Sequence, residues 1–239
     1  MKREIKIIDK EKGIVQWTFP DERWYEVDGK FIPSTTWICG YYPKGVPFYK
    51  WLADKGWDEA EAIKSAAGDK GSKVHQAIDD LVSGKEIGLE SKYLNKSTGE
   101  EEELTAEEYK CIMSFAKWFK DVNPVIVGHD ILAHNEQEGY AGMVDFVCEI
   151  EGQTYIVDFK TSANIWPEYE LQVSAYKHAL NLDAKLAILQ VGYNRNKNEY
   201  KFTEVEDKFD LFLSAKKIWA NECEGIQPKQ REYPLTIKL

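Results

Sequence analysis

The segment of residues 142–162, GMVDFVCEIEGQTYIVDFKTS, constrains the fold more than any other part of the chain. It predicts two strands joined at Glu151-Gly152, with glycine where a two-residue turn favours a positive φ. The numbers of paired residues in such a hairpin add up to a constant, here about 303, so Asp145 and Asp158 are expected to face each other. Like charges directly opposite one another are destabilising, so this register favours a cation between the two carboxylates.

The first strand of this hairpin has an apolar side. We expect its side chains to alternate between the two faces of the sheet, which puts four apolar residues on the face away from Asp145: Val144, Phe146, Cys148 and Ile150. Two opposed carboxylates beside an apolar face offer hard oxygen ligands, which suit Mg²⁺ or Mn²⁺. The sequence therefore predicts a site for a divalent cation.

Lys160 lies two residues beyond Asp158 and should project from the same face of its strand. There it could orient an attacking water, help to deprotonate it, and stabilise charge that develops on a phosphate. A surface ion pair is the alternative, but the opposed Asp145 and the apolar strand disfavour it. Gln172 and Tyr176 are four residues apart and so share one helix face, which could border this site or face solvent.

His75 lies in the helical pattern GDKGSKVHQAIDD, one turn after Gly71. A glycine at that position permits the close approach of another backbone. A lone histidine on a helix is more often structural than functional, so His75 becomes a site candidate only together with the other residues.

We expect one domain over residues 1–239, because the chain has no internal repeat and no long Gly-, Ser- or Pro-rich linker. Residues 1–69 should form an N-terminal hairpin with helical elaboration, 70–222 the core, and 223–239 a C-terminal tail. The predicted fold class is α/β, with a central mixed β-sheet flanked by helices.

The expected elements follow from apolar periodicity and turn residues. Thr105 and Glu108 form a capping box that opens one helix, and the acidic run 100–103 before it should be a solvated loop. Residues 33–47 should be irregular. The expected strands are 14–19, 23–27, 30–32, 124–133, 142–150, 154–160, 184–193 and 200–203, and the expected helices are 47–54, 57–67, 70–83, 105–120, 167–181 and 206–221.

The charge balance limits the possible partners. The chain has 31 Lys and Arg against 41 Asp and Glu, a net charge of -10. Such a balance disfavours broad, non-specific wrapping of nucleic acid, which depends on neutralising phosphates. It leaves room for an enzyme with a local basic groove beside a carboxylate-rich site.

The lack of targeting signals and the pattern of cysteines predict a cytoplasmic protein. No apolar run approaches the roughly 18 residues of a membrane span, and the first residues carry charges where a signal peptide needs an apolar stretch. The cysteines are far apart and form no CxxC pair, so we expect neither a disulfide framework nor a zinc knuckle. They are Cys39, Cys111, Cys148 and Cys223.

Four segments in succession resemble the motifs of the RecB-like branch of the PD-(D/E)XK nucleases. They are GSKVHQAI, GYAGMVDF, IVDFKTS and LQVSAY. The preceding segment, IPSTTWICGYYPKGVPFYKWLADKGWDEA, is similar to its counterpart in phage-type members and in the mitochondrial genome-maintenance exonuclease. The resemblance covers roughly residues 32–195 and implies a restriction-endonuclease-like core.

This resemblance also implies roles for individual residues. His75, Asp145 and Asp158 match the residues that bind Mg²⁺ or Mn²⁺ in the family. Lys160 matches the catalytic lysine, and Gln172 and Tyr176 match residues that line the active site and contact DNA or position the lysine.

The chain departs from the family pattern in two places. Relatives often carry a glutamate about a dozen residues before the glycine of the second motif, and the nearest match here is Asp130, beside His129. Asp130 is therefore a further candidate metal ligand. Some relatives hold an iron–sulfur cluster, but only Cys223 lies in the C-terminal region, so a cluster of that type is not expected.

The expected function is that of a metal-dependent DNA nuclease that hydrolyses phosphodiesters, and we expect an exonuclease that favours single strands or free ends. It would act in phage or host DNA replication, recombination or repair, in the host cytoplasm if a phage encodes the chain. Basic candidates for tracking the backbone include Lys44, Lys73 and Arg195, and candidates for stacking on bases include Tyr41, Tyr42 and Trp51. Core packing is the alternative role of Tyr42 and Trp51. Two other functions stay open: a catalytically silent DNA-binding or assembly protein, and a metal-dependent phosphohydrolase acting on another phosphate substrate.

Overall fold

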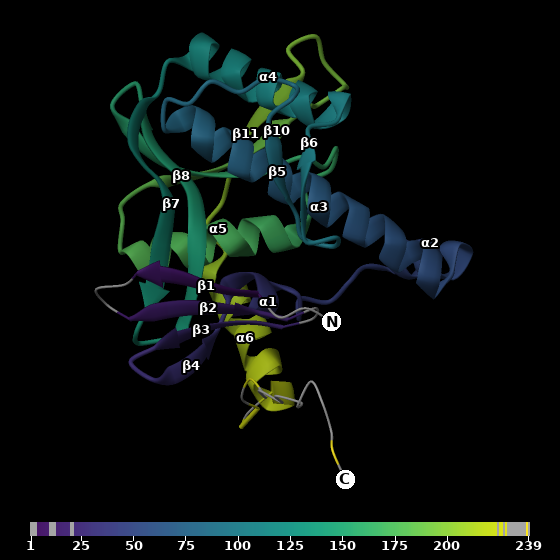
Figure 1. The fold of residues 1–239 in the computed structure, drawn as a ribbon. Coiled ribbons are helices and arrows are strands. Elements are labelled where there is room, and N and C mark those ends of the chain that lie inside the picture. The colour runs from purple at the N-terminus through teal and green to yellow at the C-terminus, as the bar shows by residue number, and fades with distance from the viewer. Residues whose placement is uncertain are drawn as a thin grey trace.

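A five-stranded mixed sheet forms the centre of the computed structural model (Figure 1), which describes residues 4–9, 13–19 and 22–223 together with 225, 226, 228 and 238. The strand order is β11-β10-β9-β8-β7. Only β9 and β10 run parallel, and the other neighbours are antiparallel. The strands are β7 (Val125–Asn135), β8 (Tyr140–Ile150), β9 (Gln153–Lys160), β10 (Lys185–Val191) and β11 (Tyr200–Val205).

Helices cover both faces of this sheet (Figure 1). On one face lie α3 (Trp57–Val82) and α4 (Ala106–Val122), and on the other lies α5 (Pro167–Leu180). The last helix, α6 (Phe209–Cys223), packs on α5. The predicted class, a mixed sheet flanked by helices, is confirmed.

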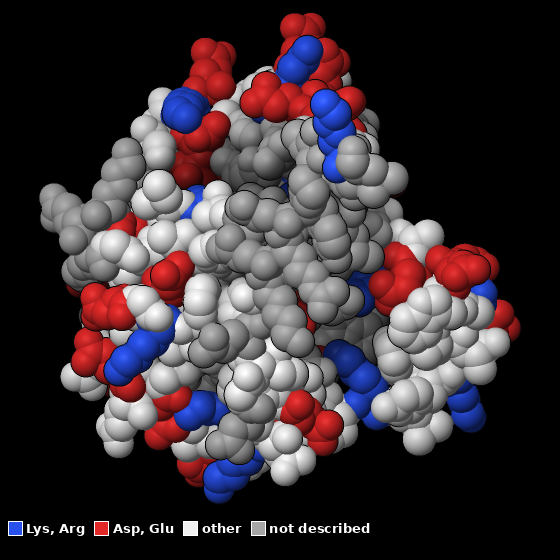
Figure 2. All heavy atoms as spheres, turned by 60° about the horizontal axis from the view of Figure 1, so that its bottom comes forward, with Lys and Arg blue, Asp and Glu red and all other residues white. Residues whose placement is uncertain are grey.

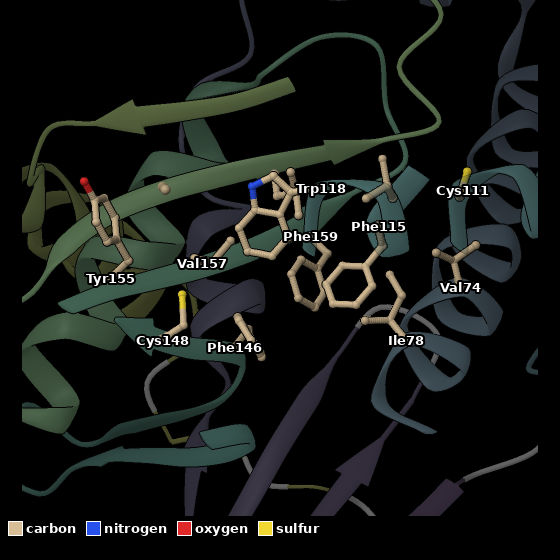
Figure 3. Close-up of a cluster of buried hydrophobic side chains, with 13 residues drawn as sticks. Val74, Ile78, Cys111, Phe115, Trp118, Phe146, Cys148, Tyr155, Val157 and Phe159 are labelled. Carbon is tan, nitrogen blue, oxygen red and sulfur yellow. The ribbon is translucent and has the colours of Figure 1, made fainter. Parts of the chain in front are cut away.

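The larger core lies between the sheet and the pair α3–α4 (Figure 3). Phe115 of α4 meets Phe159 of β9 with ring centroids 5.2 Å apart, and Phe146 of β8 lies 5.8 Å from the same ring. Each buried aromatic ring of this kind contributes about 1.5–3 kcal/mol through loss of apolar surface from water. This core therefore holds α3 against β8 and β9.

The alternation along β8 changes at Asp145. Phe146 and Cys148 share the face toward α3 and α4, and Ile150 packs against the same cluster. Val144 does not, because it packs with Val147 on the α5 face. The β7–β8 ladder passes from His129–Phe146 to Ile131–Val144 without pairing Asp130 with Asp145. Asp130 there has a left-handed backbone, φ 46°, so the strand is locally irregular.

An N-terminal sheet of four antiparallel strands packs beside β7 and β8. The three expected strands in this region form as β2 (Ile14–Thr18), β3 (Arg23–Val27) and β4 (Lys30–Pro33). The first strand, β1 (Glu4–Asp9), was not expected.

Residues 33–47, expected to be irregular, contain the short helix α1 (Thr35–Cys39). Its N-cap is Ser34, whose side chain accepts a hydrogen bond from the backbone N–H of Trp37. Ser34 also forms a parallel bridge to Ala141 at the start of β8. This capping explains why a stretch without helical periodicity still forms a turn of helix.

The helices α2 (Val46–Lys55) and α3 extend away from the sheet (Figure 1). The two helices expected at 57–67 and 70–83 are one continuous helix, because isolated glycines inside a helix cost only about 1 kcal/mol each. A Cβ at Gly71 would meet only the Oγ1 of Thr161, at 3.9 Å, so the expected close backbone approach is absent from the described residues. None of the described residues of α2 is fully buried.

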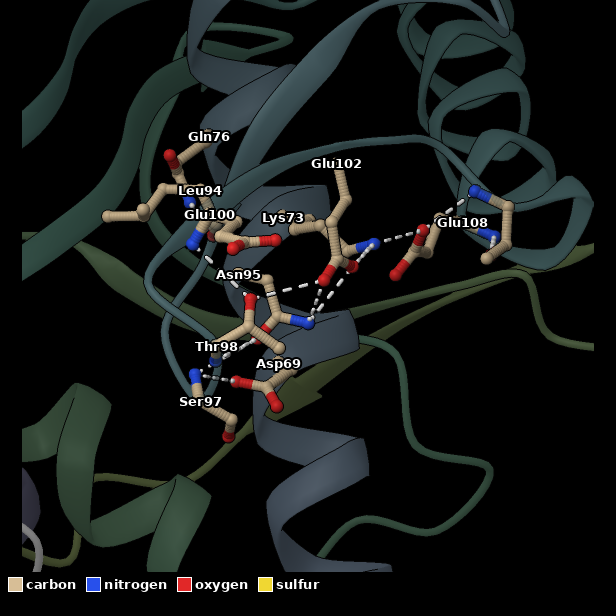
Figure 4. Close-up of polar contacts among 11 residues, drawn as sticks. Asp69, Lys73, Gln76, Leu94, Asn95, Ser97, Thr98, Glu100, Glu102 and Glu108 are labelled. Carbon is tan, nitrogen blue, oxygen red and sulfur yellow. Dashed lines mark hydrogen bonds and ion pairs between the residues drawn. The ribbon is translucent and has the colours of Figure 1, made fainter.

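The acidic run 100–103, expected to be a solvated loop, is a strand. It forms β6 (Glu100–Glu103), which pairs with β5 (Lys92–Asn95) in a hairpin on α3. Figure 4 shows why the charges are tolerated: Glu102 accepts hydrogen bonds from Asn95 and Thr98. Polar partners thus surround Glu102, whereas the other three glutamates of the strand stay exposed, as expected for a solvated run.

Lys73 lies beneath this hairpin and is only 3% exposed. Its Nζ is 3.0 Å from Oε2 of Glu108 and 3.5 Å from Oε2 of Glu102 (Figure 4). The expectation that Lys73 tracks a DNA backbone is therefore wrong, because its charge is buried and already paired. Glu108 also closes the expected capping box with Thr105, so the same carboxylate joins α3 to the start of α4.

Charges of both signs mingle over the described residues on the face shown in Figure 2, where Lys and Arg are interspersed with Asp and Glu. Among the described residues, no helix has both the length and the apolar character that crossing a bilayer requires. The four cysteines are buried free thiols.

Replacing Lys73 with Met should destabilise the protein by about 3–5 kcal/mol, because it leaves the buried carboxylate of Glu108 without its cation. The double variant Lys73→Met, Glu108→Gln should regain most of this loss, since no buried charge is then stranded. Urea denaturation measures both free energies of unfolding. A loss under about 1 kcal/mol in the single variant would show that the pair does not hold the helices together.

Candidate active site

The residues predicted to form a site do come together, where the middle of β8 and the end of β9 meet α3 and α5. The end of β9 packs beside the last turns of α3, because both contribute to the same aromatic core. Helix α5 packs on the opposite face of the sheet. The residues are Asp145 on β8, Asp158 and Lys160 on β9, His75 on α3, and Gln172 and Tyr176 on α5.

The expected register holds, but hydrogen-bonded pairing stops just short of the two aspartates. The β8–β9 ladder runs from Ile150–Gln153 to Phe146–Val157, and each pair adds up to the same number. Beyond that point the Oδ2 of Asp145 accepts a hydrogen bond from the backbone N–H of Phe159, at 2.8 Å. The carboxylate thus satisfies a backbone donor that the ladder no longer pairs.

Each aspartate has its own basic partner. Oδ1 of Asp145 lies 3.1 Å from Nδ1 of His75. Oδ2 of Asp158 lies 2.6 Å from Nζ of Lys160. The like-charge repulsion expected between the two carboxylates is therefore offset by the ammonium of Lys160 beside Asp158 and by the imidazole of His75 beside Asp145.

Burial separates the acidities of the two aspartates. Asp158 is 1% exposed, and burial raises its pKa to about 6, with a further rise from Asp145 and an opposing effect from Lys160. Burial also acts against the charge of Asp145, but the charge and hydrogen bond of His75, helped by Lys160, hold the pKa of Asp145 below its usual value. The pKa values of two carboxyl groups in one site are thus shifted in opposite directions.

Lys160 is an ammonium rather than a base in this arrangement. Burial lowers its pKa, but the negative charges of Asp158 and Asp145 outweigh burial and hold the pKa above its usual value. The Nζ also lies 4.5 Å from the ring centroid of Tyr169, a cation–π contact. Of the roles expected for Lys160, the structure favours charge stabilisation over proton abstraction.

Gln172 connects the members of the site. Its Oε1 accepts a hydrogen bond from Lys160 at 3.2 Å, and its Nε2 donates to Oδ1 of Asp158 at 3.0 Å and to the hydroxyl of Tyr176 at 2.8 Å. Tyr176 is 2% exposed, so this helix face does not point to solvent. Gly142 is required beside it, because a Cβ there would come within 2.6 Å of the Tyr176 ring.

A cavity of about 210 Å³ opens beside the pair His75–Asp145, and Phe159 also lines it. A second pair of the same kind lines this cavity: Nδ1 of His129 lies 2.5 Å from Oδ1 of Asp79. Sequence reasoning missed this second pair. A signal was available, since Asp79 lies four residues after His75 on the same helix face.

Asp130 also lines the cavity. Its side chain is 49% exposed and its Oδ2 lies 3.7 Å from Nζ of Lys6. The structure therefore places the candidate for the missing family glutamate on the same cavity as His75 and Asp145.

The aromatic candidates for base stacking lie elsewhere. The hydroxyl of Tyr41 is 3.0 Å from Sγ of Cys223, and Tyr42 packs on the apolar cluster around α1, α5 and α6. Trp51 lies on α2, with its ring centroid 5.9 Å from that of Phe48. The described residues that line the cavity include none of these three aromatics.

The remaining basic candidates are engaged with neighbours. Lys44 pairs with Glu168 at the start of α5, and Arg195 donates from Nη2 to Oδ1 of Asn164 at 3.3 Å. Lys44 therefore contacts the helix that follows β9, and Arg195 contacts the loop between β9 and that helix. Neither Lys44 nor Arg195 is among the described residues that line the cavity. Their expected contact with DNA stays a prediction.

The donor set suits a divalent cation by its chemistry. It combines one imidazole nitrogen with carboxylate oxygens, which Mn²⁺ accepts and, for the oxygens, Mg²⁺ prefers. His75, Asp145 and Asp158 are the residues that would hold such an ion. As the side chains lie here, both oxygens of Asp158 contact Lys160 and Gln172, and within the part of the chain that the structure describes no three His, Cys, Asp or Glu side chains are grouped so that they could hold a metal ion.

Comparison with known proteins does not assign the site to a family. No family model matches the chain, and no curated protein matches it. The case for a function rests on the residues and their geometry.

Asp158→Asn should change how stability depends on pH. The pKa of Asp158 is about 6 in the folded protein and near 3.8 in the unfolded chain, so between these values only the folded state holds the proton. Wild type should therefore lose stability relative to the variant as pH rises from about 4 to about 6. Urea denaturation of both proteins in chelator measures this difference, and a difference that is constant or grows with pH would contradict the assignment.

Proposed function

We propose that the chain is a metal-dependent DNA nuclease with a restriction-endonuclease-like core. The observation that carries this proposal is the ammonium of Lys160, partly buried and held 2.6 Å from the buried Asp158, on the strand next to the Asp145–His75 pair. A protein that only bound DNA would have no need for a buried carboxylate and a neighbouring lysine whose pKa values are both shifted. The resemblance of four motifs supports the same conclusion.

In this proposal His75, Asp145 and Asp158 hold the cation. When bound, a divalent ion supplies Lewis-acid polarisation of the phosphate and a lower pKa for water. Lys160, fixed by Asp158 and Gln172, stabilises the negative charge that develops on the phosphate during in-line attack. The contacts of Gln172 keep Asp158 and Lys160 in position, so neither has to reorganise as charge develops.

The proposed substrate is a single DNA strand or a free end, in phage or host DNA replication, recombination or repair. The net charge of -10 and the mixed charges of Figure 2 disfavour long-range capture of duplex DNA. Stacking on unpaired bases contributes about 1–3 kcal/mol per base without a strongly basic surface.

The same charge also favours a second candidate, a metal-dependent phosphohydrolase acting on a small phosphate substrate. Such a substrate needs few phosphate contacts, and the cavity of about 210 Å³ is compact. Substrate comparison separates the two functions.

Purified protein with Mn²⁺ or Mg²⁺ should cut labelled linear single-stranded DNA faster than duplex or closed circular single strands, and excess chelator should abolish cutting. Gel analysis at equal salt measures the rates, and nucleotides are tested in parallel by phosphate release. Undiminished cutting in chelator would contradict metal dependence. Phosphate release from nucleotides without DNA cleavage would favour the second candidate.

Lys160→Met and Asp145→Asn should each lower the rate of DNA cleavage by about 10²–10³-fold, the loss typical of removing one preorganised electrostatic group. Lys185→Met on β10 and Glu149→Gln on β8 are matched controls, since both residues are exposed on neighbouring strands. Thermal melting checks that all four variants fold. Wild-type rates in either site variant would remove that residue from the proposed mechanism.

A further inference from the structure

Two lysines from accessory elements reach the cavity that His75 and Asp145 line. Lys6 belongs to β1 of the N-terminal sheet, and Lys96 lies in the turn between β5 and β6. Both line the cavity, and both side chains are exposed. Neither residue is part of the motifs that predicted the site, so their position is evidence independent of those motifs.

The β5–β6 hairpin is fastened to α3 on both sides of its turn. Next to Lys96, the backbone N–H of Ser97 donates to Oδ1 of Asp69 at 3.2 Å, and the hydroxyl of Ser97 lies 2.9 Å from that of Ser65. Further along, the buried Lys73 holds Glu102 (Figure 4). Because His75 is on the same helix, these contacts fix the backbone of Lys96 relative to His75.

Lys6 approaches from the other accessory element. Its strand pairs with β2, opposite Gln16, and its Nζ lies 3.7 Å from Oδ2 of Asp130. The left-handed backbone of Asp130 interrupts β7 there. Lys6 is therefore directed at the cavity by a strand that the expected core does not include.

The balance of charge gives these lysines a role. The cavity is lined by the carboxylates of Asp79, Asp130 and Asp145, which repel the phosphates of an approaching strand. The cation that His75, Asp145 and Asp158 are proposed to hold would neutralise the phosphate being cut, but not the phosphates beside it. Lys6 and Lys96 are the lysines that line this cavity among the described residues.

We propose that Lys6 and Lys96 form a phosphate clamp, which binds backbone phosphates on either side of the phosphodiester that is cut. The clamp rests on the proposed nuclease function and deepens it, since it names the groups that hold the strand. It acts in binding and not in bond cleavage, so it should affect KM and leave kcat unchanged.

The test is steady-state cleavage of a fluorescein-labelled single-stranded oligodeoxynucleotide with Mn²⁺, over a series of KCl concentrations. Lys6→Ala and Lys96→Ala should each raise KM about two- to fivefold, the range of one exposed charge pair, with kcat unchanged. Each should also reduce the slope of log KM against log salt by about 0.7, the value for one phosphate contact on a single strand. Arginine at either position should restore both quantities.

Lys30→Ala and Lys92→Ala are the matched controls, because these exposed lysines lie on the same two accessory elements and the described lining of the cavity does not include them. An unchanged KM and salt slope in both clamp variants, or equal shifts in the controls, would overturn the clamp.

Fluorescence anisotropy of the same oligonucleotide separates failure of the clamp from failure of the nuclease. If wild type binds the strand without cutting it, the nuclease fails, and weaker binding by Lys96→Ala still supports the clamp. If wild type neither cuts nor binds the strand, both proposals fail.

Discussion

The ion pair between Asp158 and Lys160 is the interaction on which the rest of the site depends. An isolated buried charge costs several kcal/mol, so the carboxylate of Asp158, which is 1% exposed, depends on Lys160 to remain charged at the end of β9. Their contact at 2.6 Å leaves Oδ1 of Asp158 to Gln172, which ties the pair to α5. Asp145 meets the same constraint by pairing with His75 on α3. Helix α3 on one face of the sheet and α5 on the other thus each supply a partner for one carboxylate.

Helix α3 joins this site to the accessory hairpin. One stripe of the helix, containing Asp69, Lys73 and Gln76, binds the β5–β6 hairpin, and His75 beside it faces Asp145. Because the helix is continuous, a contact at one end constrains the position of the other. The buried cluster around Lys73 therefore contributes to the geometry of the site without touching it.

The hairpin of β8 and β9 could be predicted from sequence because a two-residue turn fixes the register, and Phe146–Val157 pair as expected. The position of Val144 could not, since the alternation changes where Asp130 adopts a left-handed backbone, a local irregularity without a strong sequence signal. The burial of Lys73 could not be predicted either, for another reason. Its burial depends on Glu102 and Glu108, distant in sequence, and an acidic run predicts solvent exposure when no partner is known.

The central claim, that these paired charges serve phosphodiester hydrolysis, is tested most directly by following the oxygen of the attacking water. Purified protein, Mn²⁺ and a single-stranded oligodeoxynucleotide are incubated in water enriched in ¹⁸O, and the products are analysed by mass spectrometry. The account predicts that each new terminal phosphate carries ¹⁸O and that Lys160→Met yields almost none of this product. Intact substrate with the wild-type protein, or cleavage without ¹⁸O in the phosphate, would contradict it.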